Sequence, residues 1–188
     1  SAYGWHIATA LYESPTFGGA SWLAHATLMT GEWIDRQEKY QALMTSERPN
    51  LATYFRDAGY RTVALMPGLK MLWPEGTFYG YDKIWNADQL KYTGPEFGWW
   101  RIPDQYSLAH FYDVEGTDTN RNPLFVFFAT ISSHMPFSPT PPYQENWDRI
   151  LSHTPYDQKL LALGTEPSVN PKTARFAYEK AIDYELRL

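Results

Sequence analysis

The sequence has no cysteine, which excludes disulfide bonds and thiolate metal ligands. It has no apolar run near ~20 residues, the length that a membrane-spanning helix needs, and no secretory signal pattern. It also lacks any run of Lys or Arg, and its formal net charge is −5. We therefore expect no nucleic-acid partner. His, Asp and Glu do not cluster at metal-ligand spacing anywhere in the sequence.

Aromatic side chains, in contrast, are abundant, with 8 Trp, 14 Tyr and 10 Phe among 188 residues. Such rings line carbohydrate and lipid-headgroup sites, but they also fill protein cores, and we assign most of them to packing. The length suits one domain with a sizeable core.

The segment from Glu13 to Gly31 carries the most information. Ser14-Pro15 and Gly18-Gly19 predict a loop, and a helix then begins at Ser21 and ends at Gly31. The apolar face of this helix is predicted to hold Leu23, Ala24, Thr27 and Leu28. Ser21 stands where the loop becomes the helix. The local pattern fits a helix N-cap and also a nucleophile or oxyanion ligand beside the positive end of the helix dipole.

Read from Ser21, the segment Ser-Trp-Leu-Ala-His-Ala-Thr-Leu-Met-Thr-Gly resembles the nucleophile segment of the sulfatase and alkaline-phosphatase superfamily. Sulfatases carry Cys or Ser, one residue, Pro-Ser-Arg and, further on, Leu-Leu-Thr-Gly. Residues 28–31, Leu-Met-Thr-Gly, fall on the last of these, and Ser21 falls on the nucleophile. Leu23, Ala24 and His25 stand in place of Pro-Ser-Arg, which argues against formylglycine formation.

The pattern is more similar to the phosphoglycerol and phosphoethanolamine transferases of the same superfamily, whose nucleophile is an unmodified threonine. The resemblance implies that Ser21 is the nucleophile and a metal ligand. Thr16 is the alternative nucleophile, and His25 is expected to bind substrate.

A helix–strand unit follows further along the chain. Residues 49–59 predict a helix with Leu51, Tyr54, Phe55 and Ala58 on its apolar face, and residues 61–66 predict a buried strand. The loop of residues 67–76 then leaves the carboxyl end of that strand, where α/β proteins collect ligands. In the transferases this loop contacts substrate. By resemblance, Trp73 and Lys70 bind substrate here, although a Trp packed on the rim beside a solvated Lys fits equally well.

A second buried strand, residues 123–131, runs directly into Ser-Ser-His-Met-Pro-Phe at 132–137. Because it is apolar on both faces, we expect it to be central in a parallel sheet. The His-x-Pro resembles another superfamily hallmark, in which the histidine reaches the substrate phosphate or sulfate. His134 is therefore expected to donate a proton or hydrogen bond to an oxyanion, rather than only to be satisfied within a turn.

The remaining stretches carry weaker patterns. A short strand is predicted near residues 7–12, and residues 86–122 are predicted to be rich in loops, with Asp104 as a helix N-cap and Arg101 as a minor candidate for a phosphate contact. Residues 138–171 are rich in proline and are predicted to form a surface excursion. Residues 171–188 predict an amphipathic helix whose apolar face holds Ala174, Ala177, Tyr178, Ala181 and Ile182.

These features predict an α/β fold, an alkaline-phosphatase-like sandwich with a mainly parallel sheet that is incomplete at both ends. Residues 1–188 are expected to be the middle of a sulfatase-like catalytic domain, whose other metal ligands lie outside the chain. The resemblance implies a divalent metal, with Mn, Mg, Zn and Ca not distinguished, and none bound tightly by this chain. It also implies a full-length protein with transmembrane helices in the inner membrane and a periplasmic or extracellular catalytic domain.

The function implied is that of a metal-dependent hydrolase or transferase. It would act on phosphate or sulfate esters of cell-envelope lipids or glycans, and the 188-residue chain alone is expected to be inactive. The alternative is a catalytically inactive pseudoenzyme or carbohydrate-binding module that uses the aromatic loops.

Overall fold

The computed structural model describes residues 6, 8–98, 102–164 and 173–188, so Arg101 lies outside the described residues. The chain forms two compact units, which we describe separately. The first comprises Ser1–Tyr54 with Glu75–Gly80, and the second comprises Phe55–Pro74 with Tyr81–Leu188.

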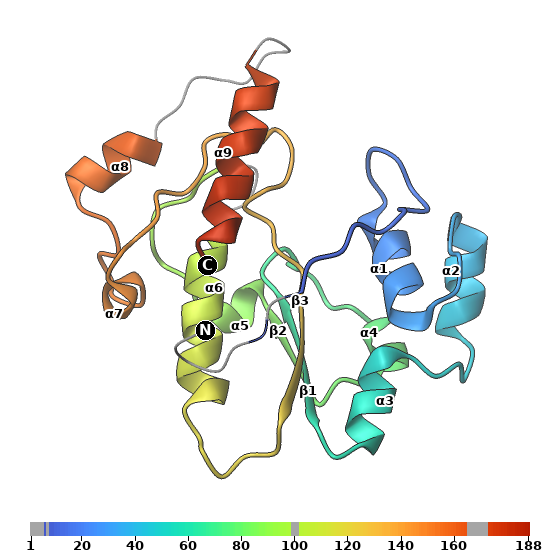
Figure 1. Cartoon of the computed structure of the whole chain (residues 1–188). Coiled ribbons are helices and arrows are strands. Elements are labelled where there is room, and N and C mark those ends of the chain that lie inside the picture. The colour runs from blue at the N-terminus through green and yellow to red at the C-terminus, as the bar shows by residue number, and fades with distance from the viewer. Residues whose placement is uncertain (1–5, 7, 99–101, 165–172) are drawn as a thin grey trace. The chain divides into compact units, whose positions relative to one another are not determined.

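The first unit is helical. Helix α1 spans Ser21–Thr30, α2 spans Gln37–Met44, α4 spans Gly76–Tyr79, and α3 (Leu51–Asp57) begins in this unit (Figure 1). Its core consists of Leu23, Ala26, Ile34, Tyr40 and Leu43. The predicted helix from Ser21 to Gly31 is thus confirmed, whereas α2 was not predicted.

The predicted apolar face of α1 is partly wrong. Leu23 and Thr27 are buried as expected, but the helix turns Ala26 and Met29 inward and leaves Leu28 45% exposed. The reason is contact with α2, since Leu23 and Ala26 pack in one cluster with Tyr40.

The predicted strand near residues 7–12 is also wrong for residues 8–12, which have no strand structure. A strand exists only where a neighbour completes its hydrogen-bond ladder. In the described ranges, the strand ladders pair β1 with β2 and β1 with β3, and residues 8–12 belong to neither ladder.

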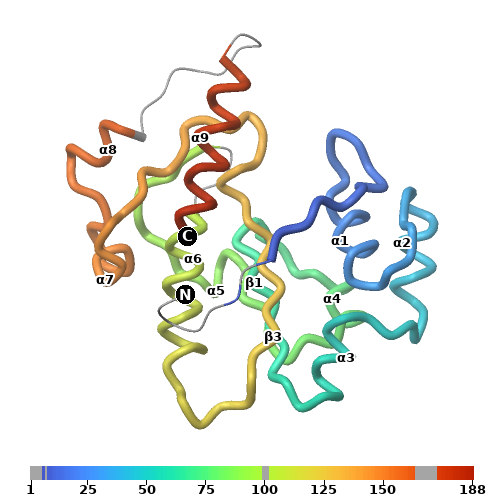
Figure 2. The backbone as a smooth tube through the Cα atoms, viewed as in Figure 1, coloured from blue at the N-terminus to red at the C-terminus, as the bar shows by residue number. Residues whose placement is uncertain are grey.

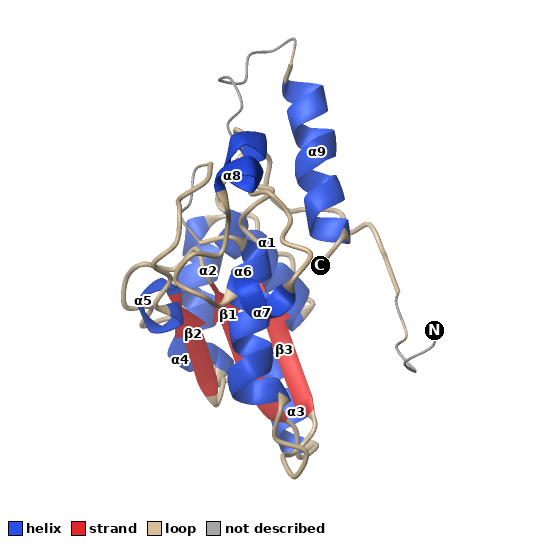
Figure 3. Cartoon of the chain, turned by 90° about the vertical axis from the view of Figure 1, so that its left-hand side faces the viewer, coloured by secondary structure: helices blue, strands red, loops and turns tan. Residues whose placement is uncertain are grey.

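The second unit contains a parallel three-stranded sheet in the order β2-β1-β3 (Figure 3). Strand β1 spans Arg61–Met66, β2 spans Lys83–Asn86, and β3 spans Leu124–Phe128. The predicted strand at 61–66 and the predicted parallel α/β arrangement are confirmed. The expectation that residues 123–131 form the central strand is wrong for this sheet, because β1 pairs on both sides, Val63 being opposite both Lys83 and Val126. Accordingly, residues 62–65 of β1 are buried, whereas β3 is half-buried throughout.

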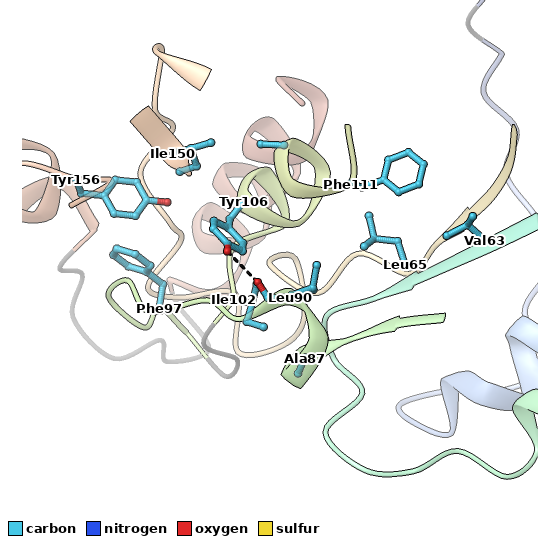
Figure 4. Packing of buried hydrophobic residues seen from close by; sticks show 11 residues of the cluster. Val63, Leu65, Ala87, Leu90, Phe97, Ile102, Tyr106, Phe111, Ile150 and Tyr156 are labelled. Atoms are coloured by element: carbon cyan, nitrogen blue, oxygen red, sulfur yellow. Dashed lines mark hydrogen bonds between the residues drawn. The ribbon is translucent and has the colours of Figure 1, made fainter. Parts of the chain in front are cut away.

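The main core lies on one face of this sheet. Val63 and Leu65 of β1 pack with residues of α5 (Ala87–Leu90), α6 (Asp104–Phe111) and α7 (Trp147–Ile150), as Figure 4 shows. The Tyr106 hydroxyl donates to the Leu90 carbonyl at 2.8 Å. The cluster consists of Val63, Leu65, Ala87, Leu90, Phe97, Ile102, Tyr106, Ala109, Phe111, Ile150 and Tyr156.

The helix expected to follow Asp104 is present as α6, and residues 86–122 also contain α5 and a π-helix, η1 (Tyr112–Gly116), between their loops. One sequence prediction is corrected. Residues 138–164 are not a surface excursion: they include α7 and α8 (Gln158–Gly164), and both Ile150 and Tyr156 enter the core. The apolar side chains in residues 138–164 are spaced irregularly among prolines, so they gave no periodic pattern from which a helix could be predicted. Burial of these side chains nevertheless determines how the stretch folds.

The two remaining predicted helices are present with shifted faces. Asn50 caps α3 by accepting from the amides of Ala52 (2.9 Å) and Thr53 (3.2 Å). Phe55 stacks on Phe125 of β3 with ring centroids 4.4 Å apart, but the expected Leu51, Tyr54 and Ala58 are exposed. Helix α9 spans Ala174–Leu186 and buries Ala177, Ala181 and Tyr184 rather than Tyr178. None of the helices in the described ranges is long and apolar enough to cross a bilayer.

Candidate active site

Backbone geometry places Ser21 at the start of α1. Gly18 and Gly19 have φ angles of 71° and 124°, and Ala20 follows with a φ of 53°. These left-handed conformations turn the chain into the helix and make Ala20 the N-cap, with Ser21 as the first helical residue. The N-cap interpretation of Ser21 is therefore wrong. Its exposed side chain stands in the first turn, where the amide dipoles favour negative charge.

The other end of α1 explains why the segment closes on Thr-Gly. The Thr30 hydroxyl donates to the Ala26 carbonyl at 2.7 Å and accepts from the Glu32 amide at 3.3 Å. Gly31 has a φ of 68°, and its amide donates to the Thr27 carbonyl at 2.8 Å. A left-handed residue that returns its amide to the last turn is a common helix stop. Thr30 and Gly31 thus fix the carboxyl end of α1.

His25 and Thr16 lie near Ser21 in the same unit. His25 is on α1, one turn after Ser21, and burial lowers the pKa of its imidazole, so the ring is neutral at pH 7. It can offer a substrate a neutral N–H donor rather than a cation. Thr16 is half-buried in the preceding loop, and its amide donates to the Ser14 hydroxyl at 3.2 Å.

In the second unit, the loop that carries Lys70 and Trp73 leaves the carboxyl end of β1. The Leu69 amide donates to the Met66 carbonyl at 3.0 Å, and the Leu69 carbonyl accepts from the Ala87 amide at 3.0 Å. These bonds hold the first residues of the loop against the end of β2. Lys70 is exposed beyond them, and Trp73 is half-buried.

His134 lies in the turn that follows β3. Its amide donates to the Ile131 carbonyl at 3.0 Å, and its carbonyl accepts from the Phe137 amide at 2.9 Å. The ring is exposed, with Nδ1 2.6 Å from the Met135 carbonyl. Because a carbonyl can only accept, Nδ1 carries the proton. Nε2 is then the atom that can donate to an oxyanion when the ring is charged.

The backbone beyond this turn continues past α9, as the tube in Figure 2 shows for residues 129–146. Phe137 meets Tyr178 of α9 edge-on, with ring centroids 5.3 Å apart. The residues that follow His134 are therefore packed against α9 through the Phe137 ring.

Asp104 supports the same turn through hydrogen bonds to its backbone, a role that was not predicted from the sequence. Its helix is capped by Pro103, so the predicted N-cap role is wrong. The fully buried carboxylate instead accepts from the amides of Ile131 (2.7 Å) and Ser132 (2.5 Å), and the Ser132 hydroxyl accepts from the Asp104 amide at 3.0 Å. These partners are 27 and 28 residues away, so no local sequence signal could have revealed them.

The candidates thus fall into two groups. Ser21, His25 and Thr16 lie together in the first unit, whereas Lys70, Trp73 and His134 belong to the second. In the second unit, a Cβ built on Gly68 would lie 3.3 Å from Ile131 Cδ1, so the loops after β1 and β3 start side by side. Among the residues described in either unit, His, Asp and Glu side chains form no group of three that could hold a metal ion.

Comparisons with known proteins now bear on this arrangement. The sequence model of the Sulfatase family matches residues 8–162. The chain belongs to the sulfatase family. No curated protein matches this sulfatase-family chain by sequence.

A solved structure supports the fold. The chain is similar to the lipoteichoic acid synthase LtaP from Listeria monocytogenes, with a TM-score of 0.60 and 14% sequence identity. The similarity covers 93% of this chain and 41% of that protein. The family match confirms the expected superfamily, and the structural similarity confirms the α/β fold with a parallel sheet. The chain spans about two fifths of the length of LtaP.

Proposed function

We propose that the protein containing this chain cleaves or transfers a phosphate or sulfate ester with Ser21 as nucleophile. The observation that carries the proposal is the position of Ser21. It is the exposed first residue of a ten-residue helix, inside the segment that matches the Sulfatase family. Ser21 Oγ forms a bond to phosphorus or sulfur, and the bond to the substrate alcohol breaks. Water or an acceptor alcohol then displaces the serine and takes the group.

The other candidates have roles that fit their chemistry. The charged His134 ring donates its Nε2 proton to the leaving oxygen or to an oxyanion, with the ring oriented by the Met135 carbonyl. The neutral His25 donates a hydrogen bond to substrate. Lys70 supplies a positive charge, and Trp73 an apolar surface, on the loop after β1.

We further propose that Ser21 is a ligand of the divalent metal implied by the family. The described part of the chain offers no group of three acidic, His or Cys side chains to complete such a site. When bound, such an ion lowers the pKa of a coordinated hydroxyl and stabilises the anionic group.

Apolar exposure near Ser21 supports an amphiphilic substrate in the cell envelope. In the first unit, Phe17 is fully exposed in the loop before α1, and Trp22 is 47% exposed directly after Ser21. Such side chains suit lipid or glycan esters presented at a membrane. We accordingly propose an envelope enzyme, membrane-anchored in its full-length form, with a periplasmic or extracellular catalytic domain.

Trapping the covalent intermediate tests the nucleophile. The full-length protein would be incubated with divalent metal and 4-nitrophenyl phosphate or 4-nitrophenyl sulfate, quenched in acid, and digested for peptide mass spectrometry. We expect a phosphoryl or sulfuryl group on Ser21, lost in Ser21→Ala and retained in Ser14→Ala, a change to a nearby exposed serine. The 188-residue chain alone should form no adduct.

Other results would redirect the assignment. A group found on Thr16 would make that residue the nucleophile. Absence of any adduct and of turnover, with retained binding to a glycan array, would favour the inactive carbohydrate-binding alternative.

A further inference from the structure

The structure assigns Asp104 and Glu185 as a carboxylic acid–carboxylate pair that positions the His134 turn, a role that rests on the function proposed for His134. Neither residue is placed in contact with substrate. Both act through the backbone of residues 131–133, and so they are positioning residues rather than catalytic ones.

The Asp104 side chain is hydrogen-bonded to the backbone that leads into the His134 turn. Asp104 is fully buried, and its Oδ2 accepts from two consecutive amides at the end of β3, those of Ile131 and Ser132. The Ile131 carbonyl in turn accepts from the His134 amide at 3.0 Å. One side chain of α6 is therefore connected, through one peptide segment, to the residue that carries the imidazole. Loss of this carboxylate would release both amides.

Asp104 and Glu185 also carry carboxyl oxygens that take no part in these backbone hydrogen bonds. Asp104 Oδ1 and both carboxyl oxygens of Glu185 are buried and lack an N–H or O–H partner at hydrogen-bonding geometry within the described ranges. The Glu185 carboxyl faces Asp104 and Ser133. Two ionised carboxylates cannot share such a site, because like charges out of water repel strongly. A proton held between them removes the repulsion and satisfies an oxygen on each residue.

That proton resides on Glu185. Burial and, second to it, the negative charge of Asp104 together raise the pKa of Glu185 to about 9. Burial raises the pKa of Asp104 too, but the amides of Ile131 and Ser132 favour its ionised form. At neutral pH, Asp104 is therefore the acceptor for the turn and Glu185 is the acid that bonds to it.

The groups around the pair set the pH range. From α9, Tyr184 faces both carboxyls, and burial raises its pKa well above 10, so it stays neutral while the pair ionises. The turn itself contributes the amide and hydroxyl groups of Ser132 and Ser133, which do not titrate. Raising the pH through about 9 should thus ionise Glu185 and place a second negative charge next to the His134 turn. Repulsion between the two carboxylates should then displace the turn.

Nuclear magnetic resonance can test this without relying on activity. Samples of the 188-residue chain labelled with ¹³C at Asp and Glu carboxyls and at the His ring would be titrated from about pH 5 to pH 11. We expect a Glu185 carboxyl midpoint near 9. The His134 ring signal should show a second step at that same pH, because the ring reports the ionisation of Glu185 through the turn.

A matched pair of variants identifies the source of that second step. Glu185→Gln keeps the shape and a donor for Asp104 but cannot ionise, and it should abolish the step. Glu179→Gln, an exposed position on the same helix, should retain it. A wild-type His134 signal without the second step, or a step that persists in Glu185→Gln, would overturn the proposal. The wild-type titration decides the question even if a variant fails to fold.

A second arm uses the full-length protein and an alkyl ester, whose leaving group needs protonation by His134. The rate of cleavage of this ester should fall above about pH 9, and the fall should be absent in Glu185→Gln. Failure of the Ser21 trapping experiment would refute the proposed nucleophile without changing the titration of the pair. Conversely, a normal Ser21 adduct combined with a silent His134 signal would refute only the positioning role.

Discussion

The two segments that carry the main candidates are built in different ways. Ser21 is placed by residues within its own helix and the loop before it: a left-handed Ala20 at the start, and Thr30 and Gly31 at the end. The His134 turn instead depends on Asp104, which lies 27 residues from Ile131, and on Glu185 from the last helix. A locally built segment withstands changes elsewhere, whereas the turn is only as well placed as the packing of α6 and α9.

The difference between the Ser21 segment and the His134 turn should be clearest in catalysis by the full-length protein. If Ser21 is the nucleophile, as proposed, Ser21→Ala should remove the covalent path and reduce kcat/KM on the order of 10³-fold or more on every ester. His134→Ala should cost roughly 10²–10⁴-fold on an alkyl ester. That defect should shrink on a nitrophenyl ester, whose leaving group needs less protonation. Steady-state rates on both substrate types provide the measurement, and near-normal rates for both variants would mean that neither residue is catalytic.

Loss of the long-range support of the His134 turn should destabilise the chain more than loss of a local contact at the end of α1. Asp104→Ala leaves two amides without their acceptor and a protonated Glu185 without its partner, so we expect a loss of about 2–4 kcal/mol in the free energy of unfolding. Thr30→Val removes a hydroxyl that water can partly replace at the end of α1 and should cost about 0.5–1.5 kcal/mol. Urea denaturation of the 188-residue chain measures both. Equal losses would show that the two segments are held equally well.

The pH dependence of stability sharpens the same contrast. The pKa of Glu185 is about 9 in the folded chain and near 4.5 when unfolded. Between these values, the folded chain keeps a proton that the unfolded chain has released. The free energy of unfolding therefore falls as the pH rises from about 5 to 9, by at most about 1.4 kcal/mol per pH unit. Glu185→Gln should flatten this slope in a urea series, and a slope unchanged by that variant would contradict the assignment.

The smallest expected effect is at the end of α1. Gly31 has a φ of 68° with open space around its Cβ position, so Gly31→Ala costs only backbone strain, about 1 kcal/mol. Gly31→Asn, which tolerates this conformation better, should cost less. Thermal denaturation of the two variants tests the order. A loss larger than that of Asp104→Ala would reverse the comparison between the two segments.

The same distinction explains what could be predicted from the sequence. Short-range signals gave the helix from Ser21 to Gly31, the strand at 61–66 and the α/β class, because glycines and unbroken apolar runs act on their own neighbours. The sequence did not reveal that Asp104 supports the His134 turn. The hydrogen-bond partners of Asp104 are set by the packing of α6 against the sheet. The sequence also misplaced Ile150 and Tyr156, whose burial depends on distant helices rather than on any local period.

The closeness of Gly68 to Ile131 has a consequence for how such chains can diverge. A methyl group at position 68 would meet Ile131 Cδ1 at 3.3 Å, so one of the two must yield by a few tenths of an ångström. The loop with Lys70 and the turn with His134 start at these two positions. In related chains, a larger residue at position 68 should therefore be accompanied by a smaller one at position 131. Reshaping one of these two loops would then constrain the other, so that changes in the loops would come as paired rather than single substitutions.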